Sequence, residues 1–499
     1  MMIPTKCVMI LLASVLNTWT CNALKNVLFL IADDLRPELS PYSSTGTQFH
    51  ANIYTPNIEA LADKSLLMKQ AHVQLPLCGP SRTSFMTGRR PDTTKVHNLD
   101  DYWRTVGGPF VTIPEHFKLN GYRTAGMGKI FHQGSASGND DDAQSWTETY
   151  FHGVKNFENN KKSWKAVSTK KLNKKTLIDE QIADNAISVL QTLSAGALNG
   201  SQHFFIAVGF KKPHLPFVFP KSIMKKHYPE DDIPLPSNPY VSDDVPSVAW
   251  NSWGELRGYT DVSNLNIDGS ENATLPDTTV KELRRAYYSA VTWMDEQLGR
   301  VVDEITNLGL EQDTIISFIS DHGFLLGEHG GWCKQTLFEL ATHTPMMLHI
   351  PGLTDGGIVT EQLAEFVDIF PTIVEAAGLS PIPLCPEDSS AITNCTEGLS
   401  LLPLITEPNT PLRAASFSQQ PRGNRMGYSI RTHDYRYTEW IKYEPSTFTA
   451  DWSVIRGLEL YDLSIDPEEN ENVAYDVSYE DIVMLLSETL QDGWRTVIV

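Results

Sequence analysis

Two strongly apolar segments, residues 26–32 (NVLFLIA) and 314–320 (TIISFIS), each end in ionisable side chains. These are Asp33 and Asp34 after the first segment, and Asp321 and His322 after the second. Continuous apolar runs of this length are typical of strands that are buried on both faces of a sheet. Ligands of open α/β sheets gather at the carboxyl ends of the strands, so we expect the two acidic ends to converge.

A divalent metal ion is the chemistry that this cluster predicts, because carboxylates brought together without a cation would repel one another. Hard oxygen donors favour calcium or magnesium over a soft metal, whereas His322 is a less usual ligand of calcium. Each acidic pair alone could be a turn or capping carboxylate. The repetition at two strand ends favours a metal site instead.

The segment LCGPSRTSFMTGRR (77–90) places a cysteine near an arginine at the start of a predicted helix. Pro80 suits the first helical position, and Gly88 suits the C-terminal stop. Cys78 would then lie at the helix N-terminus, where the helix dipole and Arg82 favour negative charge. These residues indicate an activated nucleophile beside a divalent cation, and the alternative is a buried structural cysteine.

Residues 1–23 have the pattern of a cleaved signal peptide, because Lys6 precedes an apolar run and Ala23 suits a signal peptidase. About ten apolar residues are too few to cross a hydrocarbon layer of ~30 Å, and no later segment has the length to span a membrane. We therefore expect the protein to enter the secretory pathway and to be lysosomal or secreted. Three Asn-x-Ser/Thr sequons fit that route: Asn199, Asn272 and Asn394.

Removal of residues 1–23 leaves four of the six cysteines. Cys385 and Cys395 lie in a Pro-rich, polar stretch and are predicted to close a small disulfide loop. Cys78 and Cys333 could pair with each other, bind a metal ion, or stay apart as a reactive thiol and a packed one.

The chain has 499 residues and a formal net charge of −21. This charge argues against nucleic acid as a partner, because binding to a phosphate backbone needs a basic face. An anionic substrate is still compatible with a locally basic pocket. Lysines crowd residues 155–175, which we expect to form a solvated loop or, alternatively, a rim that attracts polyanions.

Helical patterns between the two apolar segments predict a mostly parallel sheet flanked by helices. The clearest helix covers residues 280–308 and leads directly into the second apolar segment. Another helix is predicted to start at Pro56, with Thr55 as its cap.

The chain beyond residue 405 has a different pattern. Residues 429–441 (SIRTHDYRYTEWI) alternate enough to predict a small antiparallel sheet, and a helix is expected from about Tyr479. We therefore predict a catalytic domain over residues 24–405 and a C-terminal α+β subdomain over residues 406–499.

The motif CGPSR (78–82), followed by TGR (87–89), resembles the signature of type I sulfatases, in which this cysteine is oxidised to formylglycine. Segments along nearly the whole mature chain are similar to the same family: NVLFLIADDL, TPNIEALADKS, GKIFH, KKPHLPF, SDHGFLLGEHG and LELYDLSIDP. Two longer segments, at 87–104 and 426–440, resemble the iduronate-2-sulfatase branch in particular. Phe85 and His322 depart from the general family pattern, which has leucine and asparagine there, and both departures resemble that branch.

The resemblance implies an alkaline-phosphatase-like fold, one calcium ion and a formylglycine derived from Cys78. The hydrate of that aldehyde carries two hydroxyls, so one can attack sulfur and the other can later expel sulfate. The implied metal ligands are Asp33, Asp34, Asp321 and His322, together with the modified Cys78.

The resemblance also implies roles for the remaining site residues. Arg82 would orient the formylglycine hydrate, and Lys334 would bind the sulfate. Lys129 and His132 in GKIFH would bind the sulfate and assist proton transfers, while His214 would lie near the leaving oxygen.

The implied substrate is the 2-O-sulfate of iduronate at the non-reducing end of heparan or dermatan sulfate. The implied maturation partner is the formylglycine-generating enzyme. We expect Cys333 to be a packed free thiol, because a bond to Cys78 would abolish the modification. The alternatives are a phosphomonoester or phosphonate hydrolase on the same scaffold, and a catalytically silent glycan-binding protein.

Overall fold

The computed structural model describes residues 24–43, 53–271 and 273–499. The expected signal peptide at residues 1–23 and the sequon at Asn272 lie outside these described residues. None of the helices in the described part of the chain combines the length and the hydropathy that a bilayer crossing requires.

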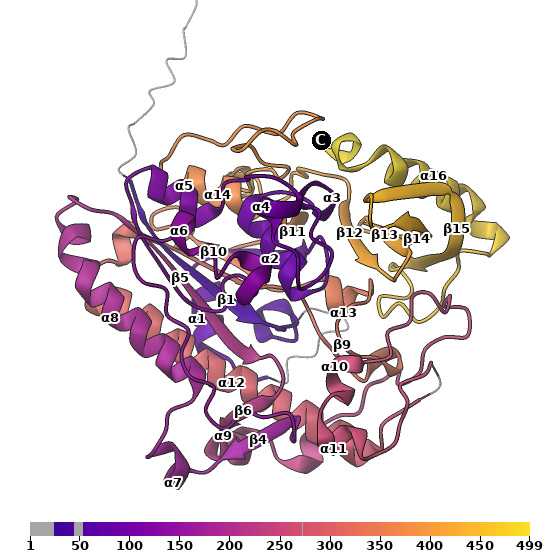
Figure 1. Cartoon of the computed structure of the whole chain (residues 1–499), viewed down its shortest axis with the longest axis horizontal. Helices are drawn as coiled ribbons and strands as arrows, with labels where there is room; N and C mark the ends of the chain where they lie inside the picture. Colours follow the sequence, from indigo (N-terminus) through magenta and orange to yellow (C-terminus); the bar gives the residue numbers. More distant parts are fainter. Residues whose placement is uncertain (1–23, 44–52, 272) are drawn as a thin grey trace, which may run out of the picture.

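A seven-stranded sheet forms the centre of the molecule (Figure 1). In spatial order its strands are β11 (Ile358–Glu365), β2 (Leu66–His72), β10 (Met346–His349), β7 (Thr314–Ser320), β1 (Asn26–Asp33), β5 (Phe204–Pro213) and β3 (Arg123–Gly128). β10 is antiparallel to both of its neighbours, and all other pairs are parallel. The predicted mostly parallel sheet is therefore confirmed.

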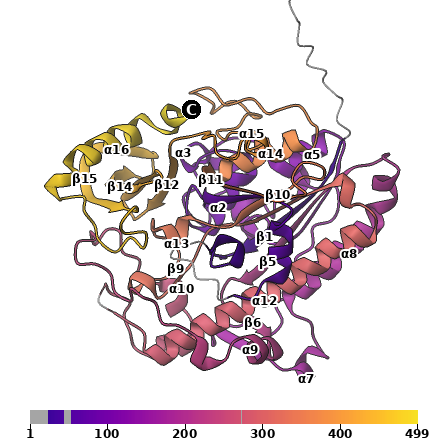
Figure 2. The same cartoon turned by 180° about the vertical axis from the view of Figure 1, so that it is seen from behind.

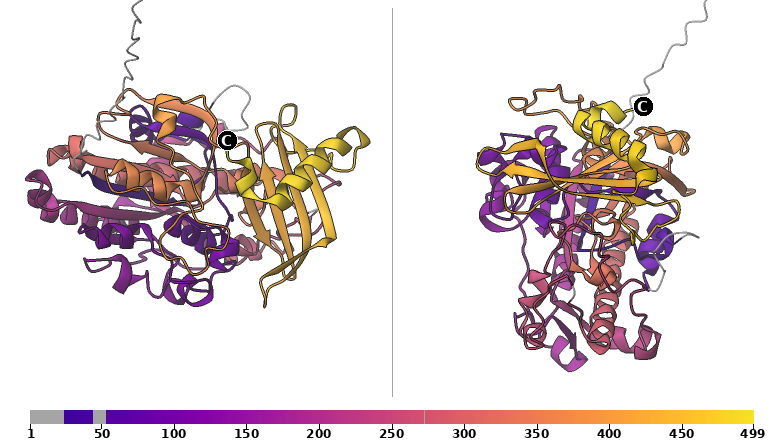
Figure 3. Two further views of the ribbon diagram at one scale, coloured as in Figure 1. Left: turned by 90° about the horizontal axis from the view of Figure 1, so that it is seen from above. Right: turned by 90° about the vertical axis from the view of Figure 1, so that its right-hand side faces the viewer.

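Alternate side chains of β1 enter two separate hydrophobic cores. Leu28 and Leu30 pack in one core with residues of the long helices α8 (Ile178–Leu198) and α12 (Asp277–Asn307). Val27 and Phe29 pack in the other core with residues of α2, α5 and α14 (Cys78–Thr87, Ile113–Leu119 and Ile369–Ala376). Figure 3 shows this central sheet between its two helical layers. Because both faces are covered, β1 is apolar at every position from Val27 to Ala32.

The predicted helices over residues 280–308 and from Pro56 are confirmed as α12 and as α1 (Pro56–Ala62). The predicted cap is wrong, because the Thr55 side chain makes no cap hydrogen bond. Instead, the buried Asp295 of α12 accepts the backbone N–H groups of Asn57 at 3.2 Å and Ile58 at 2.8 Å. A carboxylate that lies far away in the sequence thus satisfies the first turn of α1.

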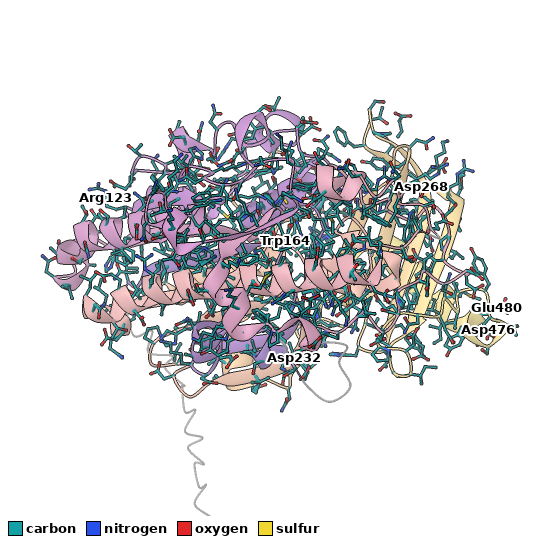
Figure 4. All side chains as sticks on the ribbon, turned by 90° about the horizontal axis from the view of Figure 1, so that it is seen from below. Arg123, Trp164, Asp232, Asp268, Asp476 and Glu480 are labelled. Carbon is teal, nitrogen blue, oxygen red and sulfur yellow. A yellow bond between two sulfur atoms is a disulfide. The ribbon has the colours of Figure 1, made fainter. Side chains whose placement is uncertain are left out.

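The C-terminal part of the chain forms a second, antiparallel sheet with a helix against it, as predicted (Figure 2). Its elements are β12 (Ser416–Pro421), β13 (Arg425–Arg431), β14 (Tyr435–Glu444), β15 (Thr449–Asp462) and α16 (Glu480–Asp492). Figure 4 places Glu480, the first residue of α16, at the opposite end of the molecule from Arg123, the first residue of β3.

A buried ion network joins this second sheet to the helix that carries Cys78. Glu365, at the end of β11, accepts two hydrogen bonds from Arg90, at 2.7 and 2.5 Å, just after α2. The same carboxylate pairs with Arg413 and accepts the Phe417 backbone N–H of β12 at 2.9 Å. Glu365 therefore connects α2, the main sheet and the C-terminal sheet.

The predicted Cys385–Cys395 disulfide is confirmed. Cys78 and Cys333 are both free and buried, so they do not pair with each other.

Replacement of Phe29 by alanine tests the packing of the central strand. Phe29 is fully buried, with its ring centroid 6.3 Å from that of Phe85 and 6.2 Å from that of Phe205. We expect Phe29→Ala to lower the free energy of unfolding by about 3–5 kcal/mol in chemical denaturation, because it leaves a cavity. The exposed Leu119→Ala variant should change it by less than about 0.5 kcal/mol. Equal effects at the two positions would contradict this account of the core.

Candidate active site

The carboxyl ends of β1 and β7 bring the acidic residues together, as the sequence predicts. The two strands are adjacent and parallel, and Ala32 pairs with Ser320, so Asp33 and Asp321 follow at the same edge. The Asp34 backbone N–H donates to Asp321 Oδ1 at 3.0 Å. Asp34 has a φ of 67°, a left-handed conformation that aspartate tolerates better than most residues.

Cys78 is the first residue of α2, and its buried sulfur faces the acidic cluster. Sγ lies 3.4 Å from His322 Nε2 and 3.8 Å from Asp33 Oδ1. Gly88 ends the helix at a φ of 63°, as predicted, whereas Pro80 is the third helical residue and not the first. The helix therefore begins at the cysteine itself.

The expected activation of the Cys78 thiol is wrong for the unmodified side chain. Burial raises the pKa of this thiol well above its ordinary value, although Lys129 and Lys334 act in the opposite direction. Removal from water thus outweighs the attraction of the nearby cations. A protonated thiol is a poor nucleophile, so this position needs a different functional group to act as one.

Arg82 ties together the two strand ends from α2. Its buried guanidinium donates to Asp321 Oδ2 at 2.9 Å and to Asp33 Oδ1 at 3.3 Å. It also donates to the Ile130 carbonyl at 3.1 Å. One planar cation therefore satisfies groups from three segments of the chain.

The two adjacent aspartates have opposite pKa shifts. Burial alone would raise the pKa of Asp33. Lys129 and other cations nevertheless lower this pKa well below its ordinary range. The Lys129 Nζ lies 2.7 and 2.6 Å from the two Asp33 carboxylate oxygens. Burial raises the pKa of Asp34, and the Lys334 ammonium at 2.9 Å only partly offsets this effect. Repulsion from Asp33 contributes to the same increase.

His214 and Glu255 form the next part of the site. Glu255 belongs to α10 (Gly254–Arg257), and its carboxylate lies 3.3 Å from His214 Nε2 and 3.0 Å from Lys334 Nζ. Although burial acts against ionisation, Lys334 and His214 lower the pKa of Glu255 to about 2. Nothing in the local sequence NSWGELRGY distinguishes this glutamate, so the sequence did not predict it.

A cavity of about 390 Å³ opens beside these groups and is lined by Asp33, Lys129, His132 and His214. Burial, followed by the charge of Lys129, lowers the pKa of His132 to about 4. Its ring atom Nδ1 is buried without a hydrogen-bond partner among the described residues. Lys155, the first residue of the lysine-rich segment, also lines the cavity, so part of that segment contributes to the rim.

The acidic cluster fits a metal ion. The ligand atoms of Asp34, Cys78, Asp321 and His322 all lie within 4.8 Å of one another, and Asp33, Asp34, Cys78 and His214 form an overlapping group. His322 Nδ1 lies 2.9 Å from the Gly323 carbonyl oxygen and can donate to it. That hydrogen bond leaves the Nε2 lone pair directed towards the carboxylates, the arrangement that metal-binding histidines adopt.

The buried neutral His322 predicts a stability effect of mild acidification. Burial is the main cause that lowers its pKa to about 4, whereas an unfolded histidine has a pKa of about 6.5. Between these values the unfolded state binds more protons, so this residue's contribution to stability is lost as the pH falls through that window. We expect the difference in thermal midpoint between metal-free wild type and His322→Asn to shrink from pH 6.5 to 4. It should be constant above pH 7.5, and a difference that is constant at every pH would contradict the assignment.

Comparisons with known proteins identify the family. The "Sulfatase" family model matches residues 25–379, and the "N-sulphoglucosamine sulphohydrolase, C-terminal" model matches residues 327–495. Iduronate 2-sulfatase of Mus musculus is 37% identical over 90% of this chain and 91% of its own length. The Homo sapiens protein of that name is 36% identical over 94% of each chain.

A solved structure shares the whole architecture. Phosphonate monoester hydrolase from Silicibacter pomeroyi superimposes with a TM-score of 0.71 over 95% of this chain and 96% of that chain, at 20% identity. This likeness concerns the fold, whereas the family match covers most of the sequence together with the cysteine and acidic motifs described above. The chain belongs to the sulfatase family.

Proposed function

We propose that this sulfate ester hydrolase removes the 2-O-sulfate of iduronate at the non-reducing end of heparan or dermatan sulfate. The observation that carries the proposal is that Cys78 lies within the acidic cluster, and that Asp33 of this cluster lines a 390 Å³ cavity together with Lys129, His132 and His214. The iduronate preference is supported by the identity with iduronate 2-sulfatases over most of the chain.

Residue 78 would act after conversion to formylglycine by the formylglycine-generating enzyme. The aldehyde hydrate would supply one hydroxyl to attack sulfur and a second to expel sulfate and restore the carbonyl. The raised pKa of the Cys78 thiol supports this proposal, because the unmodified side chain is poorly suited to attack. Arg82, which is fixed between Asp33 and Asp321, would orient the modified residue.

Asp33, Asp34, Asp321 and His322 would hold one calcium ion, together with residue 78. A divalent ion at that place would neutralise negative charge on the ester and favour the ionised nucleophile. The charges of the site support it. Four carboxylates, those of the three aspartates and Glu255, face three fixed cations, those of Arg82, Lys129 and Lys334. Two added positive charges would make the net charge favourable for an anionic substrate.

Lys129 and Lys334 would bind the sulfate oxygens, and His132 would move the protons of the hydrate. His214 would donate a proton to the departing sugar oxygen. Its Nδ1 lies 2.6 Å from the Leu215 carbonyl oxygen, while burial and Lys334 lower its pKa to about 3. A bound sulfate ester adds negative charge beside the ring, which raises that pKa towards the range that a general acid requires.

The protein would act in lysosomes or outside the cell, after passage through the secretory pathway. The Cys385–Cys395 disulfide and the exposed sequon residues Asn199 and Asn394 support that route. We also propose residues 24–405 and 406–499 as the catalytic domain and the C-terminal subdomain.

A substrate assay combined with mass spectrometry tests this function. We expect the purified protein to release sulfate from a 2-O-sulfated iduronate disaccharide, and Cys78→Ala to be at least about 10³-fold slower, because the nucleophile is lost. The peptide that contains residue 78 should carry the mass of the aldehyde. Cleavage of an aryl sulfate but not of the disaccharide would reject only the iduronate assignment. Faster cleavage of a matched phosphate or phosphonate ester would favour the alternative hydrolase.

Calcium binding is testable without an activity assay. Addition of Ca²⁺ to protein treated with a chelator should raise the thermal midpoint, corresponding to about 2.7 kcal/mol at a hundredfold excess over Kd. Asp321→Asn should abolish this increase, because it removes a ligand from the buried cluster. Asp232→Asn is a matched control at an exposed position outside the site (Figure 4). An equal increase in the Asp321→Asn variant would refute the proposed ligand set.

A further inference from the structure

One wall of the active-site cavity carries a lysine that forms no ion pair with the described residues. Lys211 lines the cavity and is only 8% exposed. Its Nζ donates to Gln133 Oε1 at 3.2 Å, and no carboxylate oxygen of the described residues lies within the 4.0 Å of an ion pair. The adjacent Lys212 differs, because its ammonium lies 3.3 Å from a carboxylate oxygen of Glu158.

The fold fixes these two lysines in different surroundings. The buried carboxylate of Asp179 accepts the backbone N–H groups of Lys211, at 2.7 Å, and Lys212, at 3.1 Å. Both lysines line the cavity, but their ammonium groups have different partners. The Lys212 ammonium donates to the Pro216 carbonyl at 2.8 Å. The Lys212 ammonium is therefore occupied by a carboxylate and by carbonyl groups, whereas the Lys211 ammonium has only an amide oxygen as its hydrogen-bond partner among the described residues.

The polar partner of Lys211 is itself held in place. Gln133 follows His132 directly, and its amide nitrogen lies 2.9 Å from His152 Nδ1. That contact turns the amide oxygen towards Lys211 and holds the ammonium at the cavity wall. A neutral amide offsets little of the free-energy cost of burying a cation. Burial of a cation is favourable only when an anion is nearby.

The nearest aspartates of the site are already paired with other lysines. Lys129 and Lys334 already pair with Asp33 and Asp34, and both are assigned to the sulfate. Burial, then repulsion from Lys155 and Lys129, lowers the pKa of Lys211 to about 8, so the side chain is still mostly charged below that pH. Lys211 thus offers the cavity a positive charge that no ion pair among the described residues uses.

We propose that Lys211 binds a carboxylate on the sugar ring that carries the sulfate, and that it selects uronate substrates over neutral sugars. This inference rests on the proposed function, since an iduronate 2-sulfate places a carboxylate and a sulfate on one ring. Lys211 is then a specificity residue that contacts substrate. Gln133 is a positioning residue that acts through it.

A matched pair of substrates tests this role. One is a 2-O-sulfated iduronate glycoside, and the other is the same glycoside with its carboxylate reduced to a hydroxymethyl group. We expect wild type to prefer the carboxylate form in kcat/KM by about 10- to 100-fold, as a charge-assisted hydrogen bond allows. Lys211→Met should lose this preference, mainly through a higher KM for the carboxylate form. Lys211→Arg should retain most of it.

The controls separate specificity from folding and from general electrostatics. Lys155→Met removes an exposed lysine from the same cavity and should keep the preference. The thermal midpoint of Lys211→Met should match that of wild type within a few degrees. Equal cleavage of both substrates by wild type would overturn this inference alone. An equal loss on both substrates in Lys211→Met would also overturn it. A wild type that cleaves neither glycoside but does cleave an aryl sulfate would overturn the iduronate assignment and this inference with it.

Discussion

The buried guanidinium of Arg82 is the contact on which the site depends. It bridges Asp33 at the end of β1 and Asp321 at the end of β7, two carboxylates that would otherwise repel each other across adjacent strands. The next residue towards the helix N-terminus, Ser81, donates its hydroxyl to the Asp321 carbonyl. Because both contacts come from the first turns of α2, they also fix residue 78 beside the acidic cluster. Strand pairing and helix placement are therefore coupled through one side chain.

The electrostatic design follows from burial. Carboxylates, cations and histidines that would titrate normally in water are placed where a low dielectric enlarges each interaction. Contacts with cations lower the pKa of Asp33, whereas burial raises the pKa of its neighbour Asp34. The same burial raises the pKa of the unmodified Cys78 thiol and so disfavours its thiolate form. A chemically altered residue 78 and a divalent ion are consistent with this environment in a way that a simple thiolate is not.

Local patterns were sufficient for some features and not for others. The apolar runs before Asp33 and Asp321 predicted two buried strands, and strand geometry then predicted that their ends meet. The roles of Lys129, His132, His214 and Lys334 came from family resemblance, because single polar residues in loops carry no local signal. Glu255, the Asp295 cap of α1 and the Gln133–Lys211 pair depend on contacts between distant segments. The protonation of Cys78 depends on depth of burial, which a sequence pattern does not specify.

The Glu365 network links the C-terminal sheet to the helix that carries residue 78. Glu365 contacts Arg90, close behind α2, and also Arg413 and the Phe417 backbone on the far side. A substitution at Arg413 would leave every side chain of the cavity intact, yet it would strip a counter-ion from a fully buried carboxylate. A displacement of Glu365 and Arg90 would be passed along α2 to residue 78 at the other end of that helix. Damage at this remote contact would therefore disturb the position of residue 78 without changing any atom that lines the cavity.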